Sequence, residues 1–170
     1  MLGPAFFARN RARLIKQLNG GSFALSAYTK MQRGHDMAGM FEQEANFWWL
    51  TGIDAPDWWM IVDGARQRTW LVMPEIDETH QIFDGSLSPE AAKDMSGADE
   101  IVTSDQGLKL LRNMAKKHSV IHTLGDFPNA EYLDFTLNPA PKKFHDLLIR
   151  TFRSVQDCRK DMAQLRALKQ

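Results

Sequence analysis

Phe41-Glu42-Gln43-Glu44-Ala45-Asn46-Phe47-Trp48-Trp49-Leu50-Thr51-Gly52 is the stretch around which this chain of 170 residues is organised. A polar approach leads to four consecutive large apolar residues at 47–50, and a glycine follows shortly after them. Because successive side chains of a strand point to opposite faces, such a run is typical of a strand that is covered on both sides. We therefore predict a strand at 47–50.

Two further strands are expected after this stretch. Residues 58–62 are followed by Asp63-Gly64 and residues 69–73 by Pro74, and both are turn or breaker signals. Three strands that are joined by short turns predict an antiparallel meander between residues 47 and 73.

Helical patterns flank these strands. Pro4 suits the first turn of a helix that reaches residue 18. Further helices are expected from Ser88 to Gly97, and from a cap at Ser104 or Asp105 to residue 117. The solvated face of the first helix is expected to carry its basic residues, Arg9, Arg11, Arg13 and Lys16.

Short apolar runs at 22–27, 100–103 and 119–124 complete the expected strands, and 119–124 is predicted to be the last one. Helices and strands therefore alternate around the meander. This order predicts an α/β fold, in which a mixed β-sheet with an antiparallel meander is flanked by helices.

The segment 142–170 differs from the rest in charge, with eight Lys or Arg and three Asp or Glu, a net of +5. We expect one amphipathic helix or two in succession there. Packing on the protein's own sheet or docking to a partner domain is favoured over an anionic surface, because no stacking aromatics interleave with the basic residues. The expected apolar stripe comprises Phe144, Leu148, Phe152, Val155, Met162 and Leu165.

Composition excludes some classes of partner. The net charge is 0 and the isoelectric point about 7.0, so no global field attracts nucleic acid or a membrane. No apolar run approaches the roughly 20 residues that span a bilayer, and no signal peptide is recognisable, so we expect a soluble, cytoplasmic protein. Cys158 is the one cysteine, and without a histidine partner we expect an inert thiol.

Catalytic motifs are not found in the sequence. Asp77 and His80 could meet on one helical turn, but the His-Glu-x-x-His pattern of zinc peptidases is missing. His118 and His122 lie on either side of a predicted change from helix to strand, so we expect their side chains to diverge. His35-Asp36 is interpreted as a loop anchor. Nor is there a Gly-x-Ser-x-Gly elbow, a dinucleotide fingerprint or a phosphate-binding loop.

The stretch 41–52 resembles the F-R-Q-[DE]-S-[ND]-F-x-Y-L-T-G signature of the N-terminal domain of the creatinase, prolidase and aminopeptidase P family. Asp36 is similar to the acidic residue that this family places before the signature. Glu42 stands where the family has arginine, and Trp49 where it often has tyrosine. Residues 165–170 resemble the L-R-x-[IL]-K-[SQ] segment near which the second domain of the family begins.

The resemblance implies a ribonuclease H-like N-terminal domain at 1–155 and a linker helix at 156–170. It implies a following "pita-bread" catalytic domain, in which two Asp, one His and two Glu hold two divalent metals, manganese, cobalt or zinc. We expect no catalytic residue, metal ligand or cofactor in this chain itself, which resembles the N-terminal part of a longer enzyme. The expected partners are its own catalytic domain and further copies of itself, as in a dimer, with no nucleic acid or membrane.

Two groups of site residues follow from the resemblance. The segment 81–85 is similar to an E-I-W-F-G segment that lines the substrate cleft in aminopeptidase P relatives, so Phe83 and the nearby His80 are the cleft candidates. An aromatic anchored in the core is an equally good interpretation of Phe83. Core packing is the default for the five tryptophans, and the interface candidates are Trp48, Trp58 and Trp59.

The leading hypothesis is therefore a non-catalytic N-terminal domain of a dinuclear-metal Xaa-Pro peptidase. It would contribute to oligomerisation and form one wall of the substrate cleft. The alternative is a stand-alone peptide- or protein-binding module of the same fold, and nucleic-acid binding through the basic tail ranks third. Whether the parent is an aminopeptidase, a dipeptidase or a creatinase-like enzyme stays open.

Overall fold

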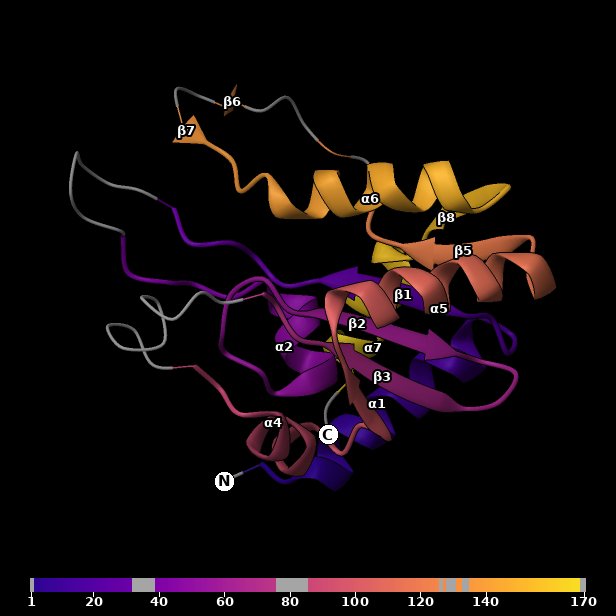
Figure 1. The fold of residues 1–170 in the computed structure, drawn as a ribbon, viewed down its shortest axis with the longest axis horizontal. Coiled ribbons are helices and arrows are strands. Elements are labelled where there is room, and N and C mark those ends of the chain that lie inside the picture. Colours follow the sequence, from indigo (N-terminus) through magenta and orange to yellow (C-terminus); the bar gives the residue numbers. More distant parts are fainter. Residues whose placement is uncertain are drawn as a thin grey trace.

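A six-stranded mixed β-sheet forms the centre of the computed structural model, which describes residues 2–31, 39–75, 86–125, 127, 131–132 and 135–168 (Figure 1). β2 runs antiparallel to β1 and β3, and the other neighbours in this sheet pair in parallel. The order across the sheet is β4 (Glu100–Val102), β3 (Arg68–Val72), β2 (Trp59–Asp63), β1 (Phe23–Ser26), β5 (Val120–Thr123) and β8 (Ser154–Asp157). A separate antiparallel pair consists of β6 (Glu131–Tyr132) and β7 (Phe135–Thr136). The predicted fold class is confirmed.

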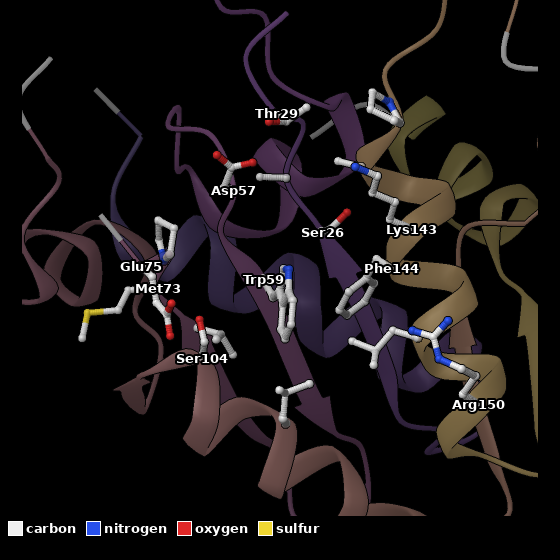
Figure 2. Close-up of a pocket in the computed structure, with 17 residues that line it drawn as sticks. Ser26, Thr29, Asp57, Trp59, Met73, Glu75, Ser104, Lys143, Phe144 and Arg150 are labelled. Carbon is white, nitrogen blue, oxygen red and sulfur yellow. The ribbon is translucent and has the colours of Figure 1, made fainter. Parts of the chain in front are cut away.

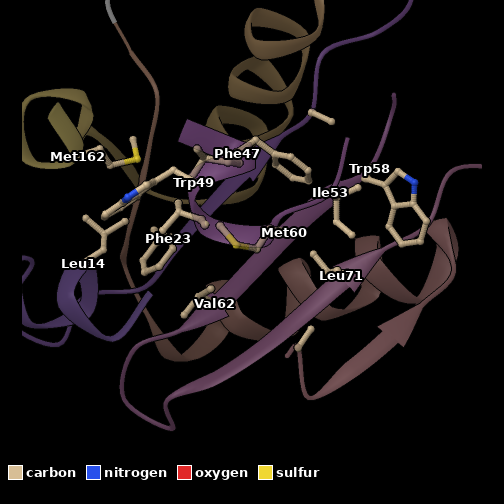
Figure 3. Packing of buried hydrophobic residues seen from close by; sticks show 14 of the residues in the cluster. Leu14, Phe23, Phe47, Trp49, Ile53, Trp58, Met60, Val62, Leu71 and Met162 are labelled. Atoms are coloured by element: carbon tan, nitrogen blue, oxygen red, sulfur yellow. The ribbon is translucent and has the colours of Figure 1, made fainter. Parts of the chain in front are cut away.

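Helices cover both faces of the sheet because its strands are apolar on both sides. Phe23 and Leu25 of β1 contact the cluster on one face, whereas Ala24 between them contacts the other. The first face carries α1 (Pro4–Gln17), α2 (Ala45–Thr51), α4 (Pro89–Ser96) and α7 (Arg159–Ala167), and Figure 3 shows part of its core. The second face carries α5 (Ser104–Lys117) and α6 (Ala140–Thr151).

The antiparallel meander exists, but its first strand differs from the predicted one. β2 and β3 correspond to the runs expected at 58–62 and 69–73, and Met60 pairs with Leu71. The third member is β1, in which Ala24 pairs with Ile61, and not the run at 47–50. The long connection between β1 and β2 therefore holds the stretch that we expected inside the sheet.

The prediction of a strand at 47–50 is wrong, because these residues belong to helix α2. Phe47 and Leu50, three residues apart, are completely buried, whereas Trp48 between them is 38% exposed. This spacing is helical. Glu44 caps the helix at its start, and Gly52 ends it in the left-handed conformation at φ 72°. These end signals outweigh the strand preference of consecutive aromatic residues.

The ends of the next two helices follow the sequence closely. Ser88 caps α4 by accepting a hydrogen bond from the Ala91 N–H, and Gly97 ends that helix, both as predicted. For α5 the cap is Thr103 rather than Ser104 or Asp105. Thr103 and Gln106 bond to each other's backbone N–H groups in a capping box, which explains the shift by one residue.

The C-terminal segment contains a strand that the sequence pattern did not predict. β8 lies between α6 and α7 and pairs with β5, so the strand expected at 119–124 is not the last one. Val155, which we expected in a helical stripe, pairs with Ile121. The predicted division after residue 155 falls within β8 and stays a prediction. No described helix is long and apolar enough to cross a lipid bilayer.

Candidate functional site

The signature stretch, residues 41–52, anchors three segments of backbone. The side-chain oxygen of Gln43 accepts hydrogen bonds from the backbone N–H groups of Tyr28 and Glu44, at 3.0 and 2.9 Å. Its amide nitrogen donates to the carbonyls of Ile53 and Ala55, at 3.1 and 2.9 Å. One half-buried amide therefore joins the segment after β1 to the segments on either side of α2.

Glu44 and Asn46 connect the start of α2 to the C-terminal helix. The carboxylate of Glu44 accepts from the Phe47 N–H at 2.6 Å and from the Asn46 amide at 3.0 Å. Asn46 in turn accepts from Arg166 of α7 at 2.9 Å. Burial raises the pKa of Glu44, although these hydrogen bonds and the charge of Arg166 act in the opposite direction.

Asn10 and Arg11 of α1 hold the ends of two other helices. The amide of Asn10 donates to the Trp49 carbonyl at 2.9 Å, and Arg11 donates to the carbonyls of Leu50 and Ser96 at 2.7 and 2.9 Å. Arg11 is 4% exposed, so its prediction on the solvated face is wrong. Burial lowers the pKa of Arg11 to about 10, so it stays protonated at neutral pH.

The polar groups of the signature stretch thus bond to the protein's own backbone and side chains. Thr51 donates from its hydroxyl to the Phe47 carbonyl and accepts from the Ile53 N–H. Gly52 lies so close to Phe7 that a Cβ atom would be 2.5 Å from the ring. The signature stretch therefore has a structural role, and residues elsewhere in the chain form the candidate binding site.

A pocket of about 570 Å³ opens on the second face of the sheet, between α5 and α6 (Figure 2). This volume lies within the range of roughly 300–1,000 Å³ that is typical of small-molecule sites. Its floor is formed by the end of β1, the start of β2 and the residues that follow β3. Its apolar centre is the ring of Trp59, which lies 5.1 Å from the ring of Phe144.

Charged side chains of opposite sign lie on opposite sides of this pocket. Figure 2 shows Asp57 and Glu75 on one side of Trp59, and Lys143 and Arg150 of α6 on the other. All four are exposed. The wall from α6 is held in place by Asn138, whose side chain bonds to both the N–H and the carbonyl of Thr29.

Ser26 gives the pocket one unsatisfied polar atom. It is 5% exposed, at the end of β1, and is one of the residues that line the pocket. Among the described residues, the Ser26 Oγ is the one buried side-chain nitrogen or oxygen without a hydrogen-bond partner. Buried hydroxyl groups without a partner are uncommon and destabilising, so this atom marks a position where a ligand could bond.

The three tryptophan candidates lie in different environments. Trp58 is 2% exposed and belongs to the core. Trp59 is partly buried in the pocket, and Trp48 is exposed on α2 with its ring centre 5.8 Å from that of Phe7. The structure does not bring these residues together, and their role at an interface stays a prediction.

The cleft candidates Phe83 and His80 lie outside the described residues, as do Asp77, His35 and Asp36. Their predicted roles therefore stay predictions. Glu75, the last described residue before this segment, lies at the rim of the pocket.

Other titratable groups serve the fold. His118 and His122 do diverge: His118 lies 3.7 Å from Asp63, whereas His122 contacts the Ser22 carbonyl at 3.1 Å. Cys158 is fully buried, and burial raises its pKa to about 12, so its lack of reactivity stays a prediction that burial supports. In the described ranges, no three His, Cys, Asp or Glu residues are grouped so that they could hold a metal ion.

Sequence reasoning missed the pocket because its residues come from distant segments. One local signal was available: Lys143, Leu147 and Arg150 recur at helical spacing on α6, and all three line the pocket. We interpreted this segment through its apolar stripe and its net charge, and did not assign its basic residues to one side of a pocket. Nothing in the sequence near Ser26 indicates that its hydroxyl would lack a partner.

The fold defines the class of protein. A protein from Bacillus anthracis described as an aminopeptidase P superposes with a TM-score of 0.82 at 20% identity, over 99% of this chain and 41% of that one. Escherichia coli aminopeptidase P, in its low pH form, gives a TM-score of 0.77 at 19% identity, over 100% and 40%. The chain thus has the α/β fold found in part of these aminopeptidase P structures.

The aminopeptidase P N-terminal domain family matches residues 7–122, and the chain belongs to this family. Among curated relatives, the Xaa-Pro aminopeptidase of E. coli K12 is 27% identical over 143 residues, 81% of this chain and 32% of the relative. A probable Xaa-Pro aminopeptidase of Botryotinia fuckeliana is 37% identical over 78 residues, 45% of this chain and 17% of the relative. The chain therefore spans about a third or less of these relatives.

Proposed function

We propose that this chain is the non-catalytic N-terminal domain of an Xaa-Pro peptidase whose two divalent metals are held by a following catalytic domain. The observation that carries the proposal is the family match over residues 7–122, together with relatives that are named Xaa-Pro aminopeptidases. One related structure is a zinc-substituted E. coli aminopeptidase P in complex with product, which supports metal-dependent hydrolysis in the parent.

In this proposal the domain forms part of the substrate cleft and of the contacts between subunits, and takes no part in the chemical step. The segment with His80 and Phe83 forms one wall of the substrate cleft, where an aromatic ring would contact the proline ring of a substrate. Trp48 contributes to contacts between subunits, since it is a large aromatic side chain left partly exposed on a rigid helix. The substrate is an Xaa-Pro peptide, and the protein acts in the cytoplasm as a homo-oligomer.

The test is an assay of the complete protein with manganese, cobalt or zinc on a dipeptide and a tripeptide that contain proline at the second position. Cleavage of the tripeptide alone identifies an aminopeptidase, and cleavage of the dipeptide a dipeptidase. No turnover of either peptide, with no Asp, Asp, His, Glu and Glu set in the complete chain, would overturn the proposal in favour of a binding module.

Phe83→Ala in the complete enzyme tests the cleft wall. We expect a higher KM or a lower kcat with an unchanged melting temperature, because the ring contacts substrate and not the core. Phe47→Ala is the control: this side chain is completely buried, so its loss should cost about 3–5 kcal/mol of unfolding free energy. A comparable loss of stability in Phe83→Ala would show that Phe83 is a core residue.

A further inference from the structure

We propose that the pocket between α5 and α6 binds a small zwitterion with an apolar middle, an amino acid or a short peptide. The pocket is lined by this chain's own described residues. The inference therefore goes beyond the proposed function, and it holds whichever reaction the complete protein catalyses.

The charged side chains of the pocket have opposite signs on its two sides. Asp57 and Glu75 face Lys143 and Arg150 across the ring of Trp59. In the described part of the chain, none of these four side chains forms an ion pair with another side chain. A ligand with a single charge would be attracted by one side and repelled by the other, whereas a zwitterion matches both.

The surface between the two charged sides of the pocket is apolar. Trp59 and Phe144 provide aromatic surface between the two charged sides, and Leu147 extends it along α6. Such surface binds the aliphatic or aromatic side chain of an amino acid by removing it from water. The volume of about 570 Å³ fits a ligand of this size and not a folded partner.

Ser26 provides a polar side chain among the residues that line the pocket. Among the described residues its buried hydroxyl has no hydrogen-bond partner, and Ser26 lines the pocket between the two charged sides (Figure 2). A hydroxyl group can donate to a carbonyl or carboxylate and accept from an amide or ammonium group, so a peptide or amino acid satisfies it in either orientation. A purely apolar ligand would leave it unsatisfied.

The two basic residues lie at separate positions along α6. Lys143 and Arg150 are seven residues apart on α6, roughly 10 Å along the helix axis. The two side chains therefore offer contacts to a carboxylate at two positions along the helix. The position of the contacted residue reports the length of the ligand.

The experiment is calorimetric titration of the full chain with the dipeptide Leu-Leu, its N-acetylated form, its C-terminal amide, and free leucine. We expect saturable binding of Leu-Leu with one site, and at least tenfold weaker binding of each blocked form. Tighter binding of leucine than of Leu-Leu would assign the site to amino acids, and the reverse to peptides. No saturable binding of leucine or Leu-Leu, or equal binding of the blocked and free dipeptides, would overturn the proposal.

Variants then locate the two ends of the ligand. At least one of Lys143→Gln and Arg150→Gln should make Leu-Leu bind as weakly as its amide, and at least one of Asp57→Asn and Glu75→Gln should make it bind as weakly as its acetylated form. Lys142→Gln and Asp54→Asn are matched controls, because both residues are exposed neighbours that do not line the pocket. Ser26→Ala should weaken binding about fivefold without unfolding the protein, since no described residue forms a hydrogen bond with its hydroxyl. Unchanged affinity in all five pocket variants would refute the site.

Discussion

Arg11 joins three helices from inside the protein. Its guanidinium donates to carbonyls near the ends of α2 and α4, where backbone acceptors lack helical partners. The sequence contained a sign of this role, because Asn10 and Arg11 fall at helical spacing from the buried Phe7 and Leu14. We assigned Arg11 to solvent from its charge alone, and charge does not report which face of a helix a residue occupies.

Arg11→Met should lower the free energy of unfolding by about 3–5 kcal/mol, because it leaves several buried carbonyls without a donor. Urea unfolding followed by tryptophan fluorescence measures this change. Lys16→Met, an exposed position on the same helix, is the control and should change stability by less than about 0.5 kcal/mol. Equal effects of the two substitutions would contradict the role of Arg11.

Asp63 accepts hydrogen bonds within the turn between β2 and β3. Its lowered pKa makes the free energy of unfolding depend on pH. Burial alone would raise its pKa, but hydrogen bonds from the Arg66 side chain and N–H, and the nearby His118, together lower it below 3.8. Because the folded-state pKa is the lower one, the stabilisation is present above pH 3.8 and is lost as the pH falls through the folded-state value.

Asp63→Asn should therefore destabilise the protein by about 1–3 kcal/mol at neutral pH. The difference from the unchanged protein should shrink as the pH falls below 3.8. Urea unfolding over this pH range measures it, with Asp54→Asn at an exposed position as the control. A difference that is constant with pH would show that the charge of Asp63 is not involved.

At the scale of elements, α2 shows where sequence patterns fail. Its seven residues are too few to reveal a helical period, and consecutive aromatics favour a strand. The ends of the helix were the better guide: Glu44 accepts from the N–H three residues later, and Gly52 adopts a positive φ. β8 was missed for a similar reason, since four partly exposed residues show no clear alternation.

Gly52→Ala should cost about 2–4 kcal/mol of unfolding free energy, because it adds strain at φ 72° and a contact of 2.5 Å with Phe7. Gly20→Ala is a matched control, since Gly20 has φ 82° but open space around its Cβ position. It should cost only the backbone term, about 1 kcal/mol. Thermal unfolding of both variants measures the difference, and equal costs would exclude the contact with Phe7 as a cause.

At the scale of the whole molecule, the sequence was sufficient for the α/β class, for β2 and β3 and for helices α1, α4 and α5. It was not sufficient for the order of strands, because pairings such as Phe23 with His122 join residues about a hundred positions apart. The pocket depends on the same distant pairings. Ser26 and Lys143 line the same pocket only after α6 has packed on the second face of the sheet, next to β1.

Cys158 provides a measure of global unfolding. Its thiol is fully buried with a pKa of about 12, so the reactive thiolate is present at roughly one part in ten thousand at pH 8. We expect almost no reaction with a thiol reagent in the native protein and complete reaction in denaturant. Rapid modification under native conditions, measured by absorbance, would show that α7 opens independently of the sheet.

The central position of β1 has a consequence for synthesis on the ribosome. β1 is translated about a hundred residues before β5, yet one of its edges pairs with that strand, which begins at Val120. The β2–β3 hairpin can form soon after it emerges, but the other edge of β1 stays open until most of the domain has been made. Nascent chains released before that point therefore carry an uncovered apolar strand, and they are the species that we expect chaperones to bind.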